Sequence, residues 1–151
     1  MKYSIIITYY QGINIVTTAL KLLCRTIKDR SDIEIIISSD NPKEDISSLK
    51  EIDNFSRIHV INATENGGYS VACNRAVKIA HGEKLILMDS DIFVTEDWLQ
   101  GLESVYSSFT NIGCVSSTIL NLNNGTVVHW GVSLMGVEVI KPFRDGQLPA
   151  Q

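Results

Sequence analysis

The chain has no apolar run that approaches the roughly 20 residues of a membrane-spanning helix. The apolar stretch near its start contains only three isoleucines before Thr8, which is too short for the hydrophobic region of a signal peptide. No basic amphipathic helix that would lie on a bilayer surface is evident. The sequence therefore predicts a cytoplasmic protein without a membrane span of its own.

Positive charge is scarce as well. There are 13 Lys and Arg residues against 17 Asp and Glu residues, the net charge is -4 at pH 7, and the basic residues are scattered. Proteins that grip the phosphate backbone of nucleic acids carry a basic patch or stripe. We therefore expect no nucleic-acid partner.

Cysteine is too sparse to build a metal centre or a disulfide framework. The three cysteines, Cys24, Cys73 and Cys114, are far apart, lack metal-ligand spacing and are odd in number. We expect reduced, mostly buried thiols, as is typical of a cytosolic protein.

What the chain does contain is ordinary globular material. Its 151 residues are 44% hydrophobic and 20% charged, enough for one domain with a sizeable core. Apolar β-branched runs alternate with segments of helical period. We predict strands over residues 3–8, 33–38, 57–62, 84–88, 114–119 and 126–128, and helices over 14–27, 43–54, 69–80 and 95–108. Thr95 is expected to cap the last helix, and Asn123-Asn124-Gly125 to form a hairpin turn. This alternation implies right-handed crossovers and a mainly parallel sheet, so the predicted fold class is α/β.

Two carboxylates follow the fourth predicted strand. The apolar run Leu85–Met88 predicts a buried strand, and it ends directly in Asp89 and Asp91, which are one residue apart. Such a pair repels unless a positive group lies between its members, and a hard divalent cation is the usual solution. We predict a metal site here; the alternative is a solvated loop in which Asp91 caps a neighbouring segment.

Two more polar residues stand at the carboxyl ends of predicted strands: Thr8 ends the first strand, and Asp40 follows the second. The carboxyl ends of parallel strands meet at one edge of the sheet, where ligands bind in open α/β folds. We expect Thr8 and Asp40 to lie beside the acidic pair. Asp40 taken alone is equally compatible with a helix cap or a turn.

A Gly-Gly pair stands just before the third predicted helix. Gly67 and Gly68 would let a ligand approach the backbone and would leave free amides at the helix start. Asn74 lies one turn into this helix and faces the same end. A plain glycine turn with a surface asparagine is the open alternative.

Taken together, these segments resemble a family 2 glycosyltransferase of the GT-A fold. The similarity covers residues 3 to about 130 and rests on the order of IIIT (5–8), IIISSD (35–40) and ENGGYSVACNRAVKIAHGEKLILMDSD (65–91). It implies a Rossmann-like fold with flanking helices. It also implies one domain over residues 1–151, with a nucleotide-binding half over 1–92 and the start of an acceptor half over 93–151. The chain stops where that half should continue, so we expect it to be truncated.

The resemblance implies a role for each matching residue. Thr8 and Tyr9 would line the base pocket through their backbone, and Asp40 would bind the base or ribose. The remaining donor contacts would come from Asn66, Gly67, Asn74 and Asp89. Asp91, with Asp89 nearby, would hold the Mn²⁺ or Mg²⁺ that bridges the donor diphosphate.

The chain also departs from the family pattern. Many members have an arginine where this chain has Cys73, and we expect the neighbouring Arg75 to be a solvated helix residue. His129 lies in a segment similar to sugar-transferring members, and we favour a structural role for it over a donor contact. The expected general base has no match: of the later acids Glu103, Glu138 and Asp145, none fits the family position.

The implied activity is inverting, metal-dependent transfer of a sugar from a nucleotide diphosphate to a glycan or lipid-linked acceptor, in surface polysaccharide synthesis. The alternative is a truncated, catalytically incomplete nucleotide-sugar-binding domain; an unrelated doubly wound domain fits the acidic residues less well. Peripheral contact with the inner face of the membrane would come from the missing segment. An apolar surface exposed by its loss would favour a homodimer.

Overall fold

The computed structural model describes residues 1–54 and 56–129. The chain divides into two compact units, residues 1–96 and residues 97–151, and each is described here by itself. The predicted assignment of a donor half and an acceptor half stays a prediction.

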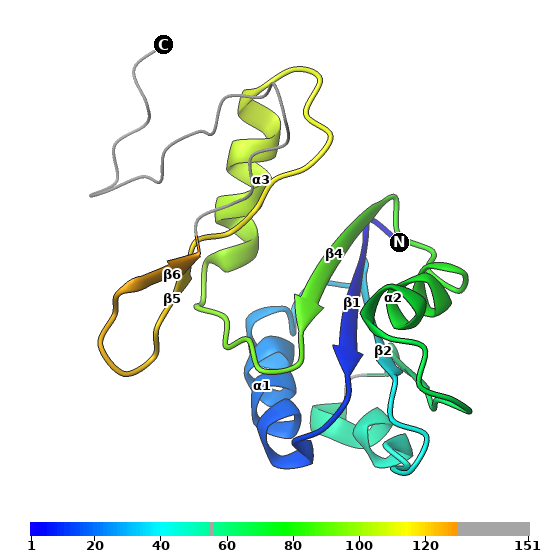
Figure 1. The fold of residues 1–151 in the computed structure, drawn as a ribbon. Helices are drawn as coiled ribbons and strands as arrows, with labels where there is room; N and C mark the ends of the chain where they lie inside the picture. Colours follow the sequence, from blue (N-terminus) through cyan, green and yellow to red (C-terminus); the bar gives the residue numbers. More distant parts are fainter. Residues whose placement is uncertain (55, 130–151) are drawn as a thin grey trace. The chain divides into compact units, whose positions relative to one another are not determined.

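The first unit is built on a parallel sheet of four strands in the order β3-β2-β1-β4 (Figure 1). The strands are β1 (Tyr3–Tyr9), β2 (Ile33–Ser39), β3 (Ile58–Ile61) and β4 (Lys84–Asp89). Every neighbouring pair is parallel. The predicted α/β fold with a parallel central sheet and flanking helices is therefore confirmed, and each of these strands lies within two residues of its predicted bounds.

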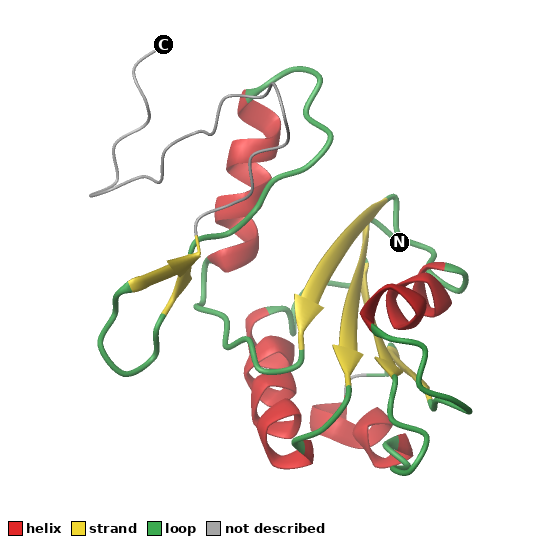
Figure 2. Ribbon diagram, in the orientation of Figure 1, coloured by secondary structure: helices red, strands yellow, loops and turns green. Residues whose placement is uncertain are grey.

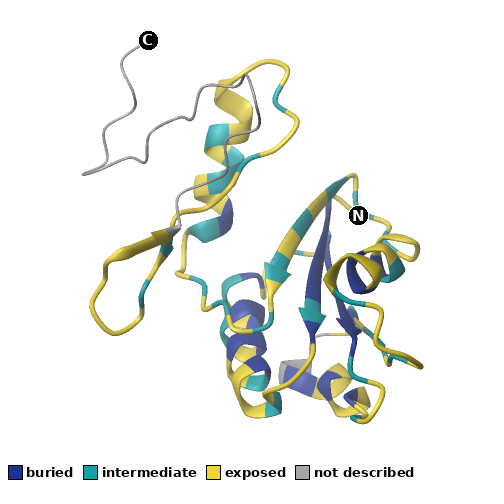
Figure 3. Ribbon diagram, viewed as in Figure 1, coloured by how far each residue is buried: buried dark blue, intermediate teal, exposed yellow. Residues whose placement is uncertain are grey.

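Helices cover both faces of the two central strands (Figure 2). The helices of this unit are α1 (Ile13–Thr26), the 3-10 helix η1 (Ser47–Asn54) and α2 (Tyr69–Val77). Ile6 of β1 and Ile36 of β2 pack against Ala76 of α2 on one face. Alternate residues of a strand point to opposite faces, so Ile5 and Ile35, both fully buried, belong to the other face. Burial of both faces explains the unbroken isoleucine runs of β1 and β2 (Figure 3).

Strand β4 differs from the buried strand that its apolar sequence predicts. Leu85 and Leu87 are 46% and 55% exposed, and alternate residues along the strand are half-buried. Among the described residues, β4 pairs with β1 alone, so it forms an edge of the sheet. Leu87 is in register with Ile6, on the face where α2 packs over β1 and β2 rather than over β4. The prediction of full burial was wrong, because β4 is an edge strand and one face of its apolar run is exposed.

The second unit contains helix α3 (Trp98–Ser108) and a two-stranded antiparallel hairpin. The hairpin strands are β5 (Ile119–Leu120) and β6 (Val127–His129). The Asn123–Gly125 turn between them is confirmed: the Gly125 amide donates to the Asn121 carbonyl at 2.9 Å, and Gly125 has a φ of 67°. Among the described residues, no helix is long and apolar enough to cross a membrane.

Two boundaries of this unit were wrongly predicted. The N-cap of α3 is Asp97, not Thr95. The strand expected over 114–119 is reduced to Ile119–Leu120, because residues 114–118 have no pairing partner within the described part of the chain. Cys114 is exposed there, whereas Cys24 and Cys73 are buried as expected; all three are free thiols.

Candidate functional site

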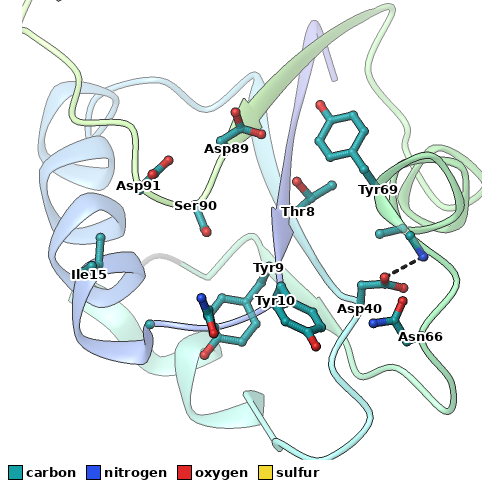
Figure 4. A pocket seen from close by; sticks show the side chains of 14 residues that line it. Thr8, Tyr9, Tyr10, Ile15, Asp40, Asn66, Tyr69, Asp89, Ser90 and Asp91 are labelled. Carbon is teal, nitrogen blue, oxygen red and sulfur yellow. Dashed lines mark hydrogen bonds between the residues drawn. The ribbon is translucent and has the colours of Figure 1, made fainter. Parts of the chain in front are cut away.

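A cleft of about 750 Å³ opens at the carboxyl ends of β1, β2 and β4, entirely within the first unit (Figure 4). This edge of a parallel sheet is where open α/β folds bind ligands. The cleft is lined by Thr8, Tyr9, Tyr10, Gln11, Gly12, Ile15, Asp40, Asn66, Gly68, Tyr69, Ala72, Asp89, Ser90 and Asp91. The structure thus brings together six of the predicted site residues, from segments more than 80 positions apart.

Asp40 closes one side of the cleft and is tied to the glycine loop. Its side chain is almost fully buried, and its backbone amide donates to the Tyr9 carbonyl at 2.7 Å. The two carboxylate oxygens accept hydrogen bonds from the amides of Gly67 at 2.9 Å and Gly68 at 2.7 Å. The bond to Gly68 is the dashed line at Asp40 in Figure 4. Asp40 is therefore both a lining residue and an anchor for the start of α2.

Both glycines are required by this geometry. Gly68 precedes α2 with a φ of 84°, a conformation that side chains rarely adopt. A Cβ added to Gly67 would lie 2.6 Å from Cγ1 of Val71. The amides at the start of a helix need hydrogen-bond acceptors outside the helix. The Gly-Gly pair allows two successive amides to donate to one carboxylate.

Arg75 lies on α2 and reaches back to the end of β2. Its Nη1 donates to the Ser39 carbonyl at 2.7 Å, and its Nη2 lies 3.8 Å from Oδ1 of Asp40. Only 24% of its side chain is exposed. The prediction of a solvated arginine was wrong. One feature of the sequence could have indicated this position: Arg75 follows Gly68 by seven residues, or two helical turns, and so lies on the same face of the helix as its start.

Asp89 and Asp91 form the opposite side of the cleft. Asp89 ends β4 in register with Thr8, and both carboxylates are exposed. Within the described residues, neither side chain has a hydrogen bond or ion pair with protein groups. No cluster of three or more acidic, His or Cys side chains suited to a metal occurs in this part of the chain. Two unpartnered carboxylates fit a hard divalent cation whose other oxygen ligands come from water or a substrate.

Three tyrosines meet the cleft in different ways. The Tyr9 ring is 1% exposed, and its hydroxyl donates to Oε2 of Glu44 at 2.7 Å. Burial, reinforced by the hydrogen bond and charge of Glu44, raises the pKa of Tyr9 far above its ordinary value. Tyr10, by contrast, is 53% exposed with its ring on the cleft. Tyr9 is the last residue of β1, which is buried along almost all of its length, whereas Tyr10 lies in the bend that follows the strand.

Tyr69, the first residue of α2, is a lining residue that the sequence did not single out. Burial raises its pKa to about 12, together with a hydrogen bond to Cys73 and the nearby charges of Cys73 and Asp89. Its phenol therefore stays protonated at neutral pH, and Figure 4 shows it projecting from α2, with Thr8 between it and Asp89. The only signal in the sequence was its position directly after the Gly-Gly pair.

The other predicted residues are placed as follows. Thr8 and Asn66 line the cleft. Gly67 meets it only through the amide bound to Asp40, and Asn74 is exposed on α2 and is not a lining residue. Glu103 lies half-buried on α3, His129 is the last residue of β6, and Glu138 and Asp145 lie outside the described residues. The predicted roles of these residues stay predictions.

Solved structures with a similar fold include TarS and a mannosyltransferase. The crystal structure of TarS from S. aureus aligns with a TM-score of 0.59 at 21% identity, covering 72% of this chain and 20% of that one. TarS 1–349 in complex with UDP gives 0.54 at 18% identity, covering 82% and 43%. The mannosyltransferase PcManGT from Pyrobaculum calidifontis, in complex with GDP-Man and Mn²⁺, gives 0.56 at 18% identity, covering 65% and 32%. These similarities establish the GT-A fold.

Sequence comparison leads to the same group of proteins. A poly(ribitol-phosphate) beta-glucosyltransferase of Bacillus spizizenii (strain W23) is 33% identical over 104 residues. The match covers 66% of this chain and 16% of that enzyme, so the chain spans a small part of its relative's length. The sequence pattern of glycosyl transferase family 2 matches residues 4–130. The chain therefore belongs to glycosyl transferase family 2.

Proposed function

We propose that the cleft binds the nucleotide-diphosphate sugar donor of a metal-dependent, inverting glycosyltransferase that acts in polysaccharide synthesis. The observation that carries this proposal is the position of Asp40 on one side of the cleft and of Asp89 and Asp91 on the other. The first carboxylate is already hydrogen-bonded to backbone amides, whereas the other two have no hydrogen-bond or ion-pair partner among the described residues. The cleft therefore has a carboxylate held in place by backbone amides on one side and two carboxylates available to bind a cation on the other.

The acidic pair is proposed to hold Mn²⁺ or Mg²⁺, with Asp91 as the direct ligand and Asp89 beside it. Both side chains offer only oxygen atoms, which these cations prefer. A bound divalent cation supplies Lewis-acid stabilisation of charge on the leaving diphosphate. The complex of PcManGT with GDP-Man and Mn²⁺ supports this assignment by analogy.

The other end of the cleft is proposed to hold the nucleoside. The exposed ring of Tyr10 offers a flat surface on which a base could stack, while the backbone of Thr8 and Tyr9 borders the same space. Asp40 retains acceptor capacity beyond its two amide bonds and would receive a hydrogen bond from the base or ribose. Asn66, Gly67 and Asn74 are proposed to follow the nucleotide along the start of α2.

The acceptor is proposed to be a glycan or a lipid-linked polymer. The relative from Bacillus spizizenii is named for transfer to poly(ribitol phosphate), an anionic polymer. Inversion would convert an α-linked nucleotide sugar into a β-glycoside. The general base that takes the acceptor proton is not assigned to any described residue.

Turnover tests this proposal. The chain is incubated with UDP-glucose, Mn²⁺ and poly(ribitol phosphate), and released UDP and the anomeric configuration of the product are measured. We expect polymer-dependent UDP release, a β-linked product, and loss of release in Asp91→Asn but not in the control Asp29→Asn, which alters an exposed carboxylate that does not line the cleft. UDP-glucose binding without release would instead support a donor-binding module without turnover. Release that Asp91→Asn leaves intact would contradict the metal assignment.

A further inference from the structure

We propose that Arg75 is a positioning residue of the cleft, which holds Asp40 in the orientation that fixes the Gly67 and Gly68 amides. This inference rests on the proposed donor site, which it deepens. Arg75 itself is not a lining residue. Any effect of Arg75 on a bound nucleotide must therefore pass through Asp40 and the loop that Asp40 anchors.

The guanidinium contacts two consecutive residues at the end of β2. One nitrogen donates to the Ser39 carbonyl at 2.7 Å, and the other lies 3.8 Å from the Asp40 carboxylate. A planar guanidinium presents its donors in a fixed fork, so the bond to Ser39 also fixes the approach to Asp40. Lysine would keep the charge but could not reproduce both contacts from one rigid group.

The carboxylate of Asp40 needs this support because it is buried. Asp40 is 6% exposed, and a buried carboxylate is costly unless hydrogen bonds and a positive group compensate its charge. The Gly67 and Gly68 amides supply the hydrogen bonds, and Arg75 supplies the positive group. These contacts together leave one stable orientation for the side chain.

The consequence reaches the cleft wall. Asn66 and Gly68 line the cleft on either side of Gly67, whose backbone is held by Asp40. If the Asp40 side chain rotates away, the Gly67 and Gly68 amides lose their acceptor, and the segment 66–68 becomes more mobile. A nucleotide would then have to order the wall on binding, which lowers its affinity without removing any direct contact.

Calorimetric titration of UDP with Mn²⁺ measures this effect. We expect Arg75→Met to weaken UDP binding about tenfold, a coupling typical of residues in one network. Arg75→Lys should fall between Arg75→Met and the unchanged chain. The matched control is Arg25→Met on α1, which removes an exposed arginine far from the network and should leave UDP affinity unchanged.

A double-mutant cycle separates positioning from general loosening of the fold. In an Asp40→Asn background, Arg75→Met should cost almost nothing further, because its route to the ligand is already broken. Hydrogen exchange of the Gly67 and Gly68 amides provides a readout that needs no ligand. Both amides should exchange faster in Arg75→Met, with amides at the centre of β1 unchanged.

Equal losses of affinity in both backgrounds, or unchanged exchange at Gly67 and Gly68, would overturn the inference. If the unchanged chain binds none of UDP, GDP and dTDP, the proposed function fails, while the exchange rates still decide whether Arg75 holds the loop. Arg75→Lys keeps both measurements available should Arg75→Met fail to fold.

Discussion

The hydroxyl of Ser4 donates a hydrogen bond of 2.6 Å to the carboxylate of Glu34 across the neighbouring strands β1 and β2. Glu34 is 2% exposed and lies near the start of β2, at the edge of the sheet opposite the cleft. Its Oε1 also accepts the backbone amide of His81 at 2.6 Å. This buried carboxylate therefore ties two strands to the segment that leads into β4.

Glu34 makes the stability of the fold sensitive to acid. Burial raises the pKa of Glu34, but the hydrogen bonds from Ser4 and His81 outweigh burial and hold this pKa below its ordinary value. Because the folded-state pKa is depressed, the stabilisation is complete above the unfolded-state pKa of about 4.3 and is lost as pH falls through the folded value. We expect chemical denaturation to show a steeper loss of stability below about pH 4.3 in the unchanged chain than in Glu34→Gln.

The control for this measurement is Glu51→Gln, which alters an exposed carboxylate on η1. At neutral pH, Glu34→Gln should also lower the free energy of unfolding by about 1–3 kcal/mol, since it leaves buried donors imperfectly paired. Parallel acid profiles for the unchanged chain and Glu34→Gln would contradict this role.

Gly82 allows the chain to pass close to β1 before β4 begins. Its amide donates to the Ser4 hydroxyl at 2.7 Å, and a Cβ placed there would lie 2.3 Å from the Ser4 backbone nitrogen. Backbone atoms of a central strand cannot move aside, so we expect Gly82→Ala to destabilise the fold by about 1–3 kcal/mol. Thermal unfolding provides the measurement.

Gly101→Ala is the matched control, because Gly101 lies within α3 and a Cβ there has open space. Alanine in place of a helical glycine should stabilise by about 0.5–1 kcal/mol. Equal melting temperatures for the two variants would show that the close approach at Gly82 is not a constraint.

Tyr10 tests the nucleoside end of the cleft. We expect Tyr10→Ala to weaken UDP binding by about 1–3 kcal/mol through lost stacking, and Tyr10→Phe to retain most of the affinity. Tyr9→Phe serves as the comparison: it removes the hydroxyl bound to Glu44 and should lower stability more than affinity. An unchanged UDP affinity in Tyr10→Ala would remove the ring from the proposed site.

The sequence predicted much of the first unit because local pattern decides it. Short runs of β-branched isoleucine favour strands covered on both faces, so β1 and β2 followed from the local pattern. Polar residues that directly follow such strands must lie at one edge, which placed Thr8, Asp40 and Asp89 together. The burial of β4 could not be predicted in this way, since an apolar run looks the same at the centre and at the edge of a sheet.

The hydrogen-bond partners of Asp40 and Arg75 could not be predicted from the sequence either. The Asp40 carboxylate meets amides 27 and 28 positions away, and Arg75 meets Ser39 across 36 positions. Such contacts depend on how the loop before α2 folds back on β2. The adjacent tyrosines at the end of β1 show the same limit, because the sequence does not say that Tyr9, the last strand residue, is buried while Tyr10, the next residue, is exposed.

The most direct test of the account is calorimetric titration of UDP, GDP and dTDP into the chain with and without Mn²⁺. The account predicts that one nucleotide binds, that binding depends on Mn²⁺, and that Asp91→Asn abolishes the metal dependence while Asp29→Asn, away from the cleft lining, does not. Absence of binding by all three nucleotides, or equal binding with and without Mn²⁺, would contradict the assignment of this cleft as a metal-dependent donor site.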